Sequence, residues 1–242
     1  MMSVRYLDRY DRQIKLFGAT GQEKLKRAKV VIAGAGGLGS PISIYLAAAG
    51  IGKIVLVDKD VVELSNLNRQ ILHWERDVGS RKALSALEKL QKMNSDIIVE
   101  AATEILDEEN VFGLVGDADL IIDAMDNFSS RYLLNKAALD RKIPFIHGAI
   151  HGFHGQATTV LPGRTACLRC IFPEAPPPET FPVVGVTPGI IGLIQATEAI
   201  KYITGLCDLL AGKLLIWYGI RPTLETIDVE RDPGCKDCGS PG

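Results

Sequence analysis

Residues 29–50, KVVIAGAGGLGSPISIYLAAAG, decide the fold of this chain of 242 residues. A short run of β-branched residues leads into glycines spaced as GxGxxG, at Gly34, Gly36 and Gly39, and a helical stretch follows. Strand, glycine turn and helix in this order are typical of a dinucleotide-binding turn. The pattern does not name the ligand, because the same backbone can hold NAD for hydride transfer or ATP for a different reaction.

Composition indicates one large α/β domain and excludes several classes of protein. Hydrophobic residues make up 47% of the chain, charged residues 23%, and the formal net charge is −2. A nucleic-acid-binding protein would carry more basic residues. The charged N-terminal segment lacks the apolar centre of a signal peptide, and no apolar run reaches the roughly 18 residues of a membrane span. We therefore expect a cytoplasmic protein that binds neither nucleic acid nor membrane.

Strand-like and helical segments alternate over the first 150 residues, as a doubly wound parallel sheet requires. Strands are expected at 29–33, 53–58, 97–102, 120–124 and 144–149, and helices at 38–49, 80–93 and 129–141. The second of these helices is expected to bury an apolar face formed by Ala83, Leu84, Leu87 and Leu90. We predict a helical N-terminal segment over 1–28 and a Rossmann-like ATP- or dinucleotide-binding region over 29–150.

The pattern changes after residue 150. Shorter strands are expected at 156–162, 213–219 and 223–229, with one helix at 190–204. These strands suggest that the parallel sheet is extended by antiparallel ones. Residues 173–188 hold six of the twelve prolines, which predicts an extended crossing loop, either a stiff surface connector or a lid over a site. We assign 151–242 to the same domain as 29–150.

Polar residues gather where the predicted strands end. Asp58 ends the second strand, where a carboxylate can accept hydrogen bonds from a ribose. The segment SNLNRQ (65–70) follows, and Lys82 lies in the first turn of the next helix. Asp126 and Asn127 come after the fourth strand. Because ligands of open parallel sheets lie beyond the carboxyl ends of the strands, these side chains are expected to meet at one site.

The chemistry of this set favours phosphate over nicotinamide. Arg69 and Lys82 would neutralise a polyphosphate, and Asp126 would hold magnesium, which prefers oxygen ligands. Hydride transfer needs none of these groups. If the attacking group is a substrate carboxylate, with an unperturbed pKa of about 3.5, no general base is required. The residues would then position the substrates and stabilise the charge of the departing pyrophosphate.

Four of the five cysteines form two CxxC pairs, Cys167 with Cys170 and Cys235 with Cys238. Four thiolates in two such pairs can close a tetrahedral, structural zinc site. A thioredoxin-like redox pair is the alternative, which two pairs in one chain make less favourable. The remaining Cys207 is expected to be a small buried apolar residue.

Three histidines lie close together in HGAIHGFHG (147–155), at positions 147, 151 and 154. Glycines and irregular spacing give them no common face, and no carboxylate or cysteine stands at ligand spacing beside them. We expect His147, His151 and His154 to be structural or solvent-facing rather than metal ligands.

Taken together, RYDRQ, GAGGLG, the Asp58 strand end, SNLNRQ, VGSRK, DAMDN and the two CxxC pairs resemble the ThiF/MoeB/HesA family, relatives of ubiquitin-activating enzymes. The match runs from about residue 5 to Cys238. The resemblance implies a homodimeric enzyme that uses ATP to adenylate the C-terminal glycine carboxylate of a small ubiquitin-fold sulfur carrier ending in Gly-Gly. It implies molybdopterin or thiamine biosynthesis, or a related sulfur-transfer pathway, without choosing among them.

The resemblance also implies a role for each site residue. The glycine turn, with Gly36, Gly37 and Gly39, contacts the nucleotide, and Asp58 contacts the ribose. The phosphates and their magnesium ion are bound by a second set of side chains: Asn66, Arg69, Lys82, Asp126 and the adjoining Asn127. Arg12, the second arginine of RYDRQ, matches a family arginine that reaches the ATP phosphates of the neighbouring subunit.

Two departures from the family pattern bear on the sulfur chemistry. Members that form a covalent thioester or acyl persulfide have a cysteine after a threonine in the crossing loop, whereas Thr180 is followed here by Phe181. No rhodanese-like module follows Cys238. We therefore expect the reaction to stop at the acyl-adenylate, with sulfur delivered by a separate protein.

Two other functions remain open at this point. An NAD-dependent oxidoreductase could use the same glycine turn, and a non-catalytic partner subunit could keep the fold without the activity. The presence of Arg69, Lys82 and Asp126 argues against both.

Overall fold

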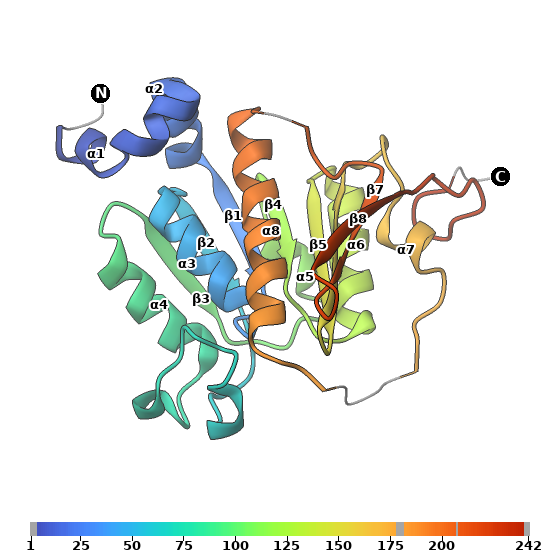
Figure 1. Cartoon of the computed structure of the whole chain (residues 1–242), viewed down its shortest axis with the longest axis horizontal. Helices are drawn as coiled ribbons and strands as arrows, with labels where there is room; N and C mark the ends of the chain where they lie inside the picture. Colours follow the sequence, from blue (N-terminus) through green and yellow to red (C-terminus); the bar gives the residue numbers. More distant parts are fainter. Residues whose placement is uncertain (1–3, 178–181, 207, 240–242) are drawn as a thin grey trace.

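The computed structural model describes residues 4–177, 182–206 and 208–239. Eight strands form one sheet in the order β3-β2-β1-β4-β5-β6-β7-β8 (Figure 1). Their bounds are β1 Lys29–Ala33, β2 Lys53–Val57, β3 Ile98–Ala102, β4 Leu120–Asp123, β5 Phe145–His151, β6 His154–Val160, β7 Lys213–Tyr218 and β8 Thr223–Asp228. Strands β1 to β5 are parallel, and β5 to β8 pair antiparallel. The predicted fold class, a Rossmann-like sheet with antiparallel C-terminal strands, is confirmed.

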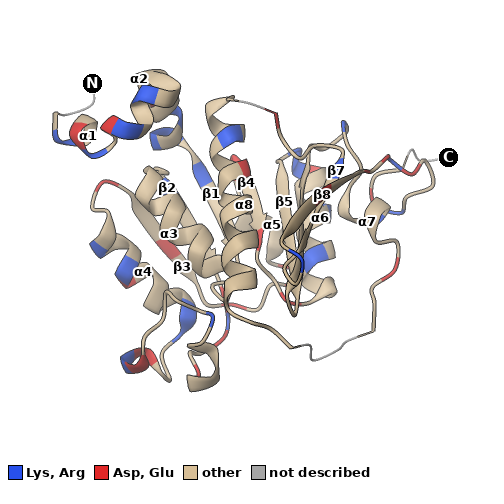
Figure 2. Ribbon diagram, viewed as in Figure 1, with Lys and Arg blue, Asp and Glu red and all other residues tan. Residues whose placement is uncertain are grey.

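Helices cover both faces of the sheet. Their bounds are α1 Val4–Arg9, α2 Asp11–Arg27, α3 Gly39–Ala49, α4 Lys82–Met93, α5 Val111–Val115, α6 Phe128–Arg141, α7 Leu168–Ile171 and α8 Val186–Thr204, with short 3-10 helices η1 Leu64–Asn66 and η2 Glu75–Asp77. One core cluster joins the strands to α3, α4 and α8, and the other joins them to α5, α6 and the cysteine segments. Helix α3 carries no charged residue (Figure 2), as expected of a helix packed against the sheet and α8. Among the described helices, none is long and apolar enough to cross a membrane.

The order of the strands determines where a ligand can lie. From β1 the chain crosses to β2 on one side, whereas β4 leads to β5 on the other, and β1 and β4 are neighbours. The loops that follow β1 and β4 therefore separate and leave a crevice at the carboxyl ends of the strands. Helix α2 ends beside the amino end of β1. It therefore lies at the amino ends of the strands, away from the crevice at their carboxyl ends (Figure 1).

Two sequence expectations need correction. Leu84 was expected on the buried face of its helix, but it is 51% exposed, and the buried positions of α4 include Lys82, Ser85 and Lys89 instead. Polar partners inside the protein, described below, explain why this helix turns polar side chains inward.

The second correction concerns the crossing loop, whose last residues, Val186 to Pro188, form the first turn of α8. A proline is tolerated there because backbone N–H groups of a first helical turn have no partner within the helix. The expected threonine–phenylalanine pair at 180–181 and Cys207 lie outside the described residues.

Candidate active site

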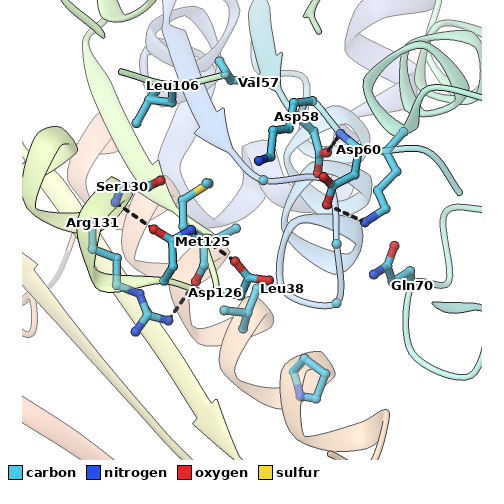
Figure 3. Close-up of a pocket in the computed structure, with 18 of the residues that line it drawn as sticks. Leu38, Val57, Asp58, Asp60, Gln70, Leu106, Met125, Asp126, Ser130 and Arg131 are labelled. Atoms are coloured by element: carbon cyan, nitrogen blue, oxygen red, sulfur yellow. Dashed lines mark hydrogen bonds and ion pairs between the residues drawn. The ribbon is translucent and has the colours of Figure 1, made fainter. Parts of the chain in front are cut away.

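A pocket of about 540 Å³ opens at the carboxyl ends of β1, β2 and β4 (Figure 3). The glycine turn after β1, the segment after β2 and the loop between β4 and α6 supply most of its lining. Residues 104–106 after β3 and Pro188 of α8 complete the walls. The crevice expected from the strand order is therefore a formed cavity.

The glycine turn is packed too tightly for larger residues. Gly34 has φ +103°, and a Cβ there would lie 2.5 Å from the carbonyl oxygen of Ala124. A Cβ at Gly39 would lie 1.9 Å from the carbonyl oxygen of Gly34. Only glycine permits this approach, because any side chain would overlap the backbone. The turn is thereby held against the loop that follows β4.

Asp58 joins the turn to the end of β2. Its Oδ2 accepts a hydrogen bond from the N–H of Ala35 at 2.8 Å, and its Oδ1 accepts one from the N–H of Asp60 at 2.8 Å. Burial raises the pKa of Asp58, an effect that the two backbone hydrogen bonds and the charge of Lys82 oppose. Each carboxylate oxygen can accept a further hydrogen bond, so Asp58 remains able to bind a ribose hydroxyl.

Both predicted phosphate-binding cations line the pocket. Lys82 is only 6% exposed, and its Nζ donates to Oδ2 of Asp60 at 3.2 Å. Arg69 donates to the carbonyl oxygen of Ser65 at 2.9 Å and to Oδ1 of Asn68 at 3.0 Å. The two cations line the same cavity as Asp126, so a polyphosphate bound there would have cationic partners and a carboxylate within one pocket.

Asp126 and Asn127 occupy the β4 side of the pocket. Both are exposed, and Asn127 Nδ2 donates to Oδ1 of Asp126 at 3.3 Å. Asn127 also caps α6 by accepting from the N–H of Ser130 at 2.9 Å. Asp126 is thus a carboxylate that faces the cavity without an ion-pair partner among the described residues, which suits a magnesium ligand.

A second, more apolar groove of about 760 Å³ adjoins the pocket. The two cavities share four lining residues, Asp126, Asn127, Arg131 and Ile150. The groove continues over the ends of β5 and β6 to Ala175, Pro176 and Pro177 at the start of the proline-rich segment. A ligand in the groove would therefore reach a nucleotide in the pocket.

Comparison with known proteins places this architecture in a family. The model of the ThiF family matches residues 10–237. The chain belongs to the ThiF family. The SAMP-activating enzyme E1 of Haloferax volcanii is 46% identical, and the match covers all of this chain and 92% of that protein. The sulfur carrier protein adenylyltransferase of Thermus thermophilus is 44% identical, covering 96% of this chain and 91% of the relative.

Longer proteins and solved structures also match this ThiF-family chain. The adenylyltransferase and sulfurtransferase MOCS3 of Culex quinquefasciatus is 42% identical, and the match covers 95% of the chain but 55% of MOCS3. The microcin C7 biosynthetic enzyme MccB in complex with N-formylated MccA superimposes with a TM-score of 0.88 at 27% identity, covering 96% of this chain and 75% of MccB. The crystal structure of E. coli MccB with ATP superimposes with a TM-score of 0.85 at 28% sequence identity, and the match covers 96% of this chain and 73% of MccB.

Three predicted site residues of this ThiF-family protein do not line the pocket. Asn66 is buried, and its Oδ1 accepts from the N–H of Glu63 at 3.1 Å, closing the turn η1. Gly39 packs on Gly34 inside the turn, and Arg12 is exposed on α2, away from the pocket of its own chain. Their proposed contacts with nucleotide stay predictions.

Arg131 lines both cavities, although no motif in the sequence marks it as a site residue. Its guanidinium donates to the carbonyl oxygen of Met125 at 2.7 Å and lies 3.6 Å from Oδ2 of the buried Asp123. Asp123 also pairs with Nδ1 of the fully buried His147 at 2.6 Å. This network fixes the loop that carries Asp126. The one feature of the sequence that points to this network is the position of Asp123 at the end of a buried strand.

The four cysteines of the CxxC pairs come together. Their sulfur atoms all lie within 4.8 Å of one another, with Cys167 and Cys235 buried. Within the described ranges, this is the one cluster of three or more potential ligands that could hold a metal ion. Burial raises the pKa of the Cys167 thiol, so a cation would be needed to keep the sulfurs ionised. Four cysteine sulfurs would fill all four positions around a tetrahedral ion, which suits a structural zinc site.

The histidines behave as expected for structural or solvent-facing residues. His147 is buried against Asp123, His154 packs its ring edge-on against Tyr218 with 5.7 Å between ring centroids, and His151 is exposed. None joins a candidate metal cluster among the residues that the structure describes.

Proposed function

We propose that this ThiF-family protein is an adenylyltransferase that uses ATP to activate the C-terminal glycine carboxylate of a ubiquitin-fold sulfur carrier, with release of pyrophosphate. The observation that carries the proposal is the pocket itself: Arg69, Lys82 and Asp126 line one cavity together with the glycine turn at the switch point of the sheet. The names of the Haloferax and Thermus relatives support the same activity.

The residues of the pocket suit adenylation by a carboxylate. The attacking carboxylate is already ionised at neutral pH, so the site needs orientation and charge stabilisation rather than a general base. Asp126 would hold magnesium, which would supply Lewis-acid stabilisation of the phosphate oxygens. Lys82 and Arg69 would stabilise the negative charge that accumulates as the bond between the α-phosphate and pyrophosphate breaks.

The competing oxidoreductase function can be separated by binding. A titration with Mg-ATP and with NAD should give magnesium-dependent ATP binding and little gain from the nicotinamide. Tighter binding of NAD than of Mg-ATP would contradict the proposal. A non-catalytic subunit would bind ATP without catalysing ATP–pyrophosphate exchange in the presence of any carrier.

The apolar groove is proposed to receive the tail of the carrier. It leads to Asp126, Asn127 and Arg131, which also line the nucleotide pocket, so a tail lying in the groove would end beside the nucleotide. Small and apolar residues such as Ala149, Gly155 and Ile216 line it, which suits an extended glycine-containing tail. The proline-rich segment begins at the rim of the groove, where Ala175, Pro176 and Pro177 line it.

Blocking the groove should weaken carrier binding selectively. We expect Ala149→Phe to raise the KM for the carrier about tenfold or more, because a bulky side chain displaces the tail, and to change the KM for ATP less than about twofold. Steady-state exchange kinetics measure both constants. Lys136→Phe on the outer face of α6 is the matched control for an added aromatic ring. Equal effects on the two KM values would contradict this placement.

We propose a homodimer in which Arg12 reaches the pocket of the other subunit. Arg12 is exposed and lies away from the pocket of its own chain. Large apolar side chains that a partner could cover are exposed in the segment between β2 and α4, at Val61, Leu64, Ile71, Trp74 and Val78, and in the first turn of α4 at Leu84. Several exposed apolar side chains in one stretch of chain favour a protein interface.

Subunit mixing tests the contribution of Arg12. Arg12→Ala and Asp126→Ala homodimers should each be nearly inactive in ATP–pyrophosphate exchange. Heterodimers isolated through two different tags should regain about half of the wild-type activity per dimer, because one of the two sites is then complete. Heterodimers without activity, or a monomer by light scattering, would contradict the proposal.

The source of sulfur is proposed to be a separate protein. Each of the four described cysteines belongs to the metal-compatible cluster, which leaves none of them as an acyl acceptor. A thiol-sensitive conjugate of the carrier with Cys207 would contradict this proposal. A cytoplasmic location stays a prediction.

A further inference from the structure

A chain of buried polar side chains lies beneath the glycine turn and does not line the nucleotide pocket. It begins at His73, which is 3% exposed, and continues through Ser85 and Lys89 of α4 to Asp77 of η2, each no more than 8% exposed. Burial of so many polar groups costs free energy unless every one is hydrogen-bonded. Nothing in the adenylation chemistry described above uses these residues.

The hydrogen bonds run in an unbroken series from Asp77 to the turn. Lys89 Nζ donates to Oδ2 of Asp77 and to Oγ of Ser85, the latter at 2.8 Å. Ser85 Oγ lies 2.9 Å from Nδ1 of His73. Nε2 of His73 lies 2.9 Å from the carbonyl oxygen of Ala35, the residue between the first two glycines of the motif.

The direction of each hydrogen bond follows from the partners at the two ends. A carbonyl oxygen can only accept, so Nε2 of His73 must carry its proton. Lys89 can only donate, so Ser85 Oγ accepts from it, and the hydrogen of Ser85 is left for Nδ1 of His73 or for the carboxylate of Asp77, with which Ser85 also interacts. When Ser85 donates to Nδ1, the imidazole is neutral with its proton on Nε2.

A neutral imidazole also agrees with the surrounding charges. Burial lowers the pKa of His73, and the positive charges of Lys89 and Lys82 act in the same direction, whereas the bond to Ala35 and the charge of Asp58 oppose them. Asp77 is paired with Lys89 and does not contact the ring.

The peptide groups around Ala35 are therefore held on two sides. Asp58 accepts from the N–H of Ala35 at 2.8 Å, and His73 donates to its carbonyl oxygen. In a planar trans peptide the C=O and the following N–H point in opposite directions. Holding the Ala35 carbonyl towards the buried His73 turns the Gly36 N–H the other way. Gly36 lines the pocket, and within the described residues its N–H has no protein partner.

We infer that His73 is a positioning residue for the adenylation reaction, which anchors the Ala35–Gly36 peptide so that the Gly36 N–H is presented to the phosphates of ATP. Ser85, Lys89 and Asp77 fix the tautomer and orientation of the imidazole. The inference rests on the proposed use of ATP, and it adds a residue outside the pocket to the nucleotide-binding machinery.

Two variants of similar polarity separate positioning from simple core packing. In His73→Gln the side-chain amide nitrogen can take the place of Nε2 and donate to the Ala35 carbonyl. In His73→Asn the shorter side chain keeps a partner for Ser85 and does not reach Ala35. We expect the Kd for Mg-ATP, measured by calorimetry, to rise about five- to tenfold in His73→Asn and less than about twofold in His73→Gln.

In these two variants, the KM for ATP and the kcat should respond differently. The KM for ATP in pyrophosphate exchange should follow the Kd, while kcat stays within about twofold of wild type in both variants. Unchanged ATP binding in His73→Asn, or equal weakening in both variants, would overturn the inference. Failure of the wild-type protein to bind Mg-ATP would instead contradict the proposed function.

A measurement on the wild-type protein serves if His73→Asn does not fold. In protein labelled with nitrogen-15 at its histidines, the spectrum of His73 should show the neutral tautomer with the proton on Nε2, and its resonance should shift when Mg-ATP is added. A proton on Nδ1, or a resonance unaffected by Mg-ATP, would overturn the inference. His73→Gln identifies the resonance by its loss.

Discussion

Replacement of Asp126 by alanine is expected to lower the rate of ATP–pyrophosphate exchange by a factor of about 100 or more, since it removes the carboxylate assigned to magnesium. The protein should stay folded, because Asp126 is exposed and its hydrogen-bond partner in the structure is the neighbouring Asn127. Exchange of labelled pyrophosphate into ATP measures the first effect, and thermal unfolding measures the second.

The Asp126→Ala result needs a control that removes an equally accessible carboxylate elsewhere. Asp140→Ala on α6 removes a surface carboxylate paired with Lys136 and should leave the exchange rate unchanged. If Asp126→Ala unfolded the protein, or if its exchange rate matched that of Asp140→Ala, the assignment of Asp126 to magnesium would be wrong.

The largest expected effect on stability comes from the cysteine cluster. Cys170→Ser should release zinc, because it removes one of four ligands that close the site. The loss should lower the free energy of unfolding by about 4 kcal/mol and Tm by about 10 °C. Metal analysis should give one zinc per wild-type chain and much less in the variant, and calorimetry should give the shift in Tm.

The nucleotide site provides the control for this substitution. The cysteine cluster packs with α6 and α7 on one side of the sheet, whereas the glycine turn leads into α3 on the other side. At temperatures below its Tm, the Cys170→Ser variant should therefore bind Mg-ATP with a Kd within about twofold of the wild-type value. A redox function would be indicated instead if the wild-type protein held no zinc and its Tm depended on added reductant.

Much of the fold could be predicted because each strand carries its own signal. The central parallel strands β1, β2 and β4 are buried on both faces, so their sequences are short apolar runs bounded by glycine or charged residues. Gly34 and Gly39 are required by backbone contacts local to the turn. Leu84 shows where periodicity fails, since the buried face of α4 is set by Lys89 and Ser85 with partners distant in the sequence.

The residues of the candidate site also fall into those that the sequence predicts and those that it does not. Asp58 and Asp126 could be predicted because each follows the end of a strand, and the topology of the sheet brings strand ends together. Lys82 could be predicted because it begins the helix that follows β2. Arg131 and His73 could not, because their positions depend on tertiary contacts with Asp123 and with the turn. Nothing in the local sequence distinguishes either residue from a surface charge or a core histidine.

The central claim is that the pocket adenylates a carrier carboxylate with ATP. The most direct measurement is magnesium-dependent exchange of labelled pyrophosphate into ATP, with candidate ubiquitin-fold carriers that end in Gly-Gly and with the same carriers lacking the last glycine. We predict exchange that requires magnesium, the wild-type protein and the intact carrier tail. No exchange with any intact carrier, or equal exchange with truncated carriers, would contradict the account.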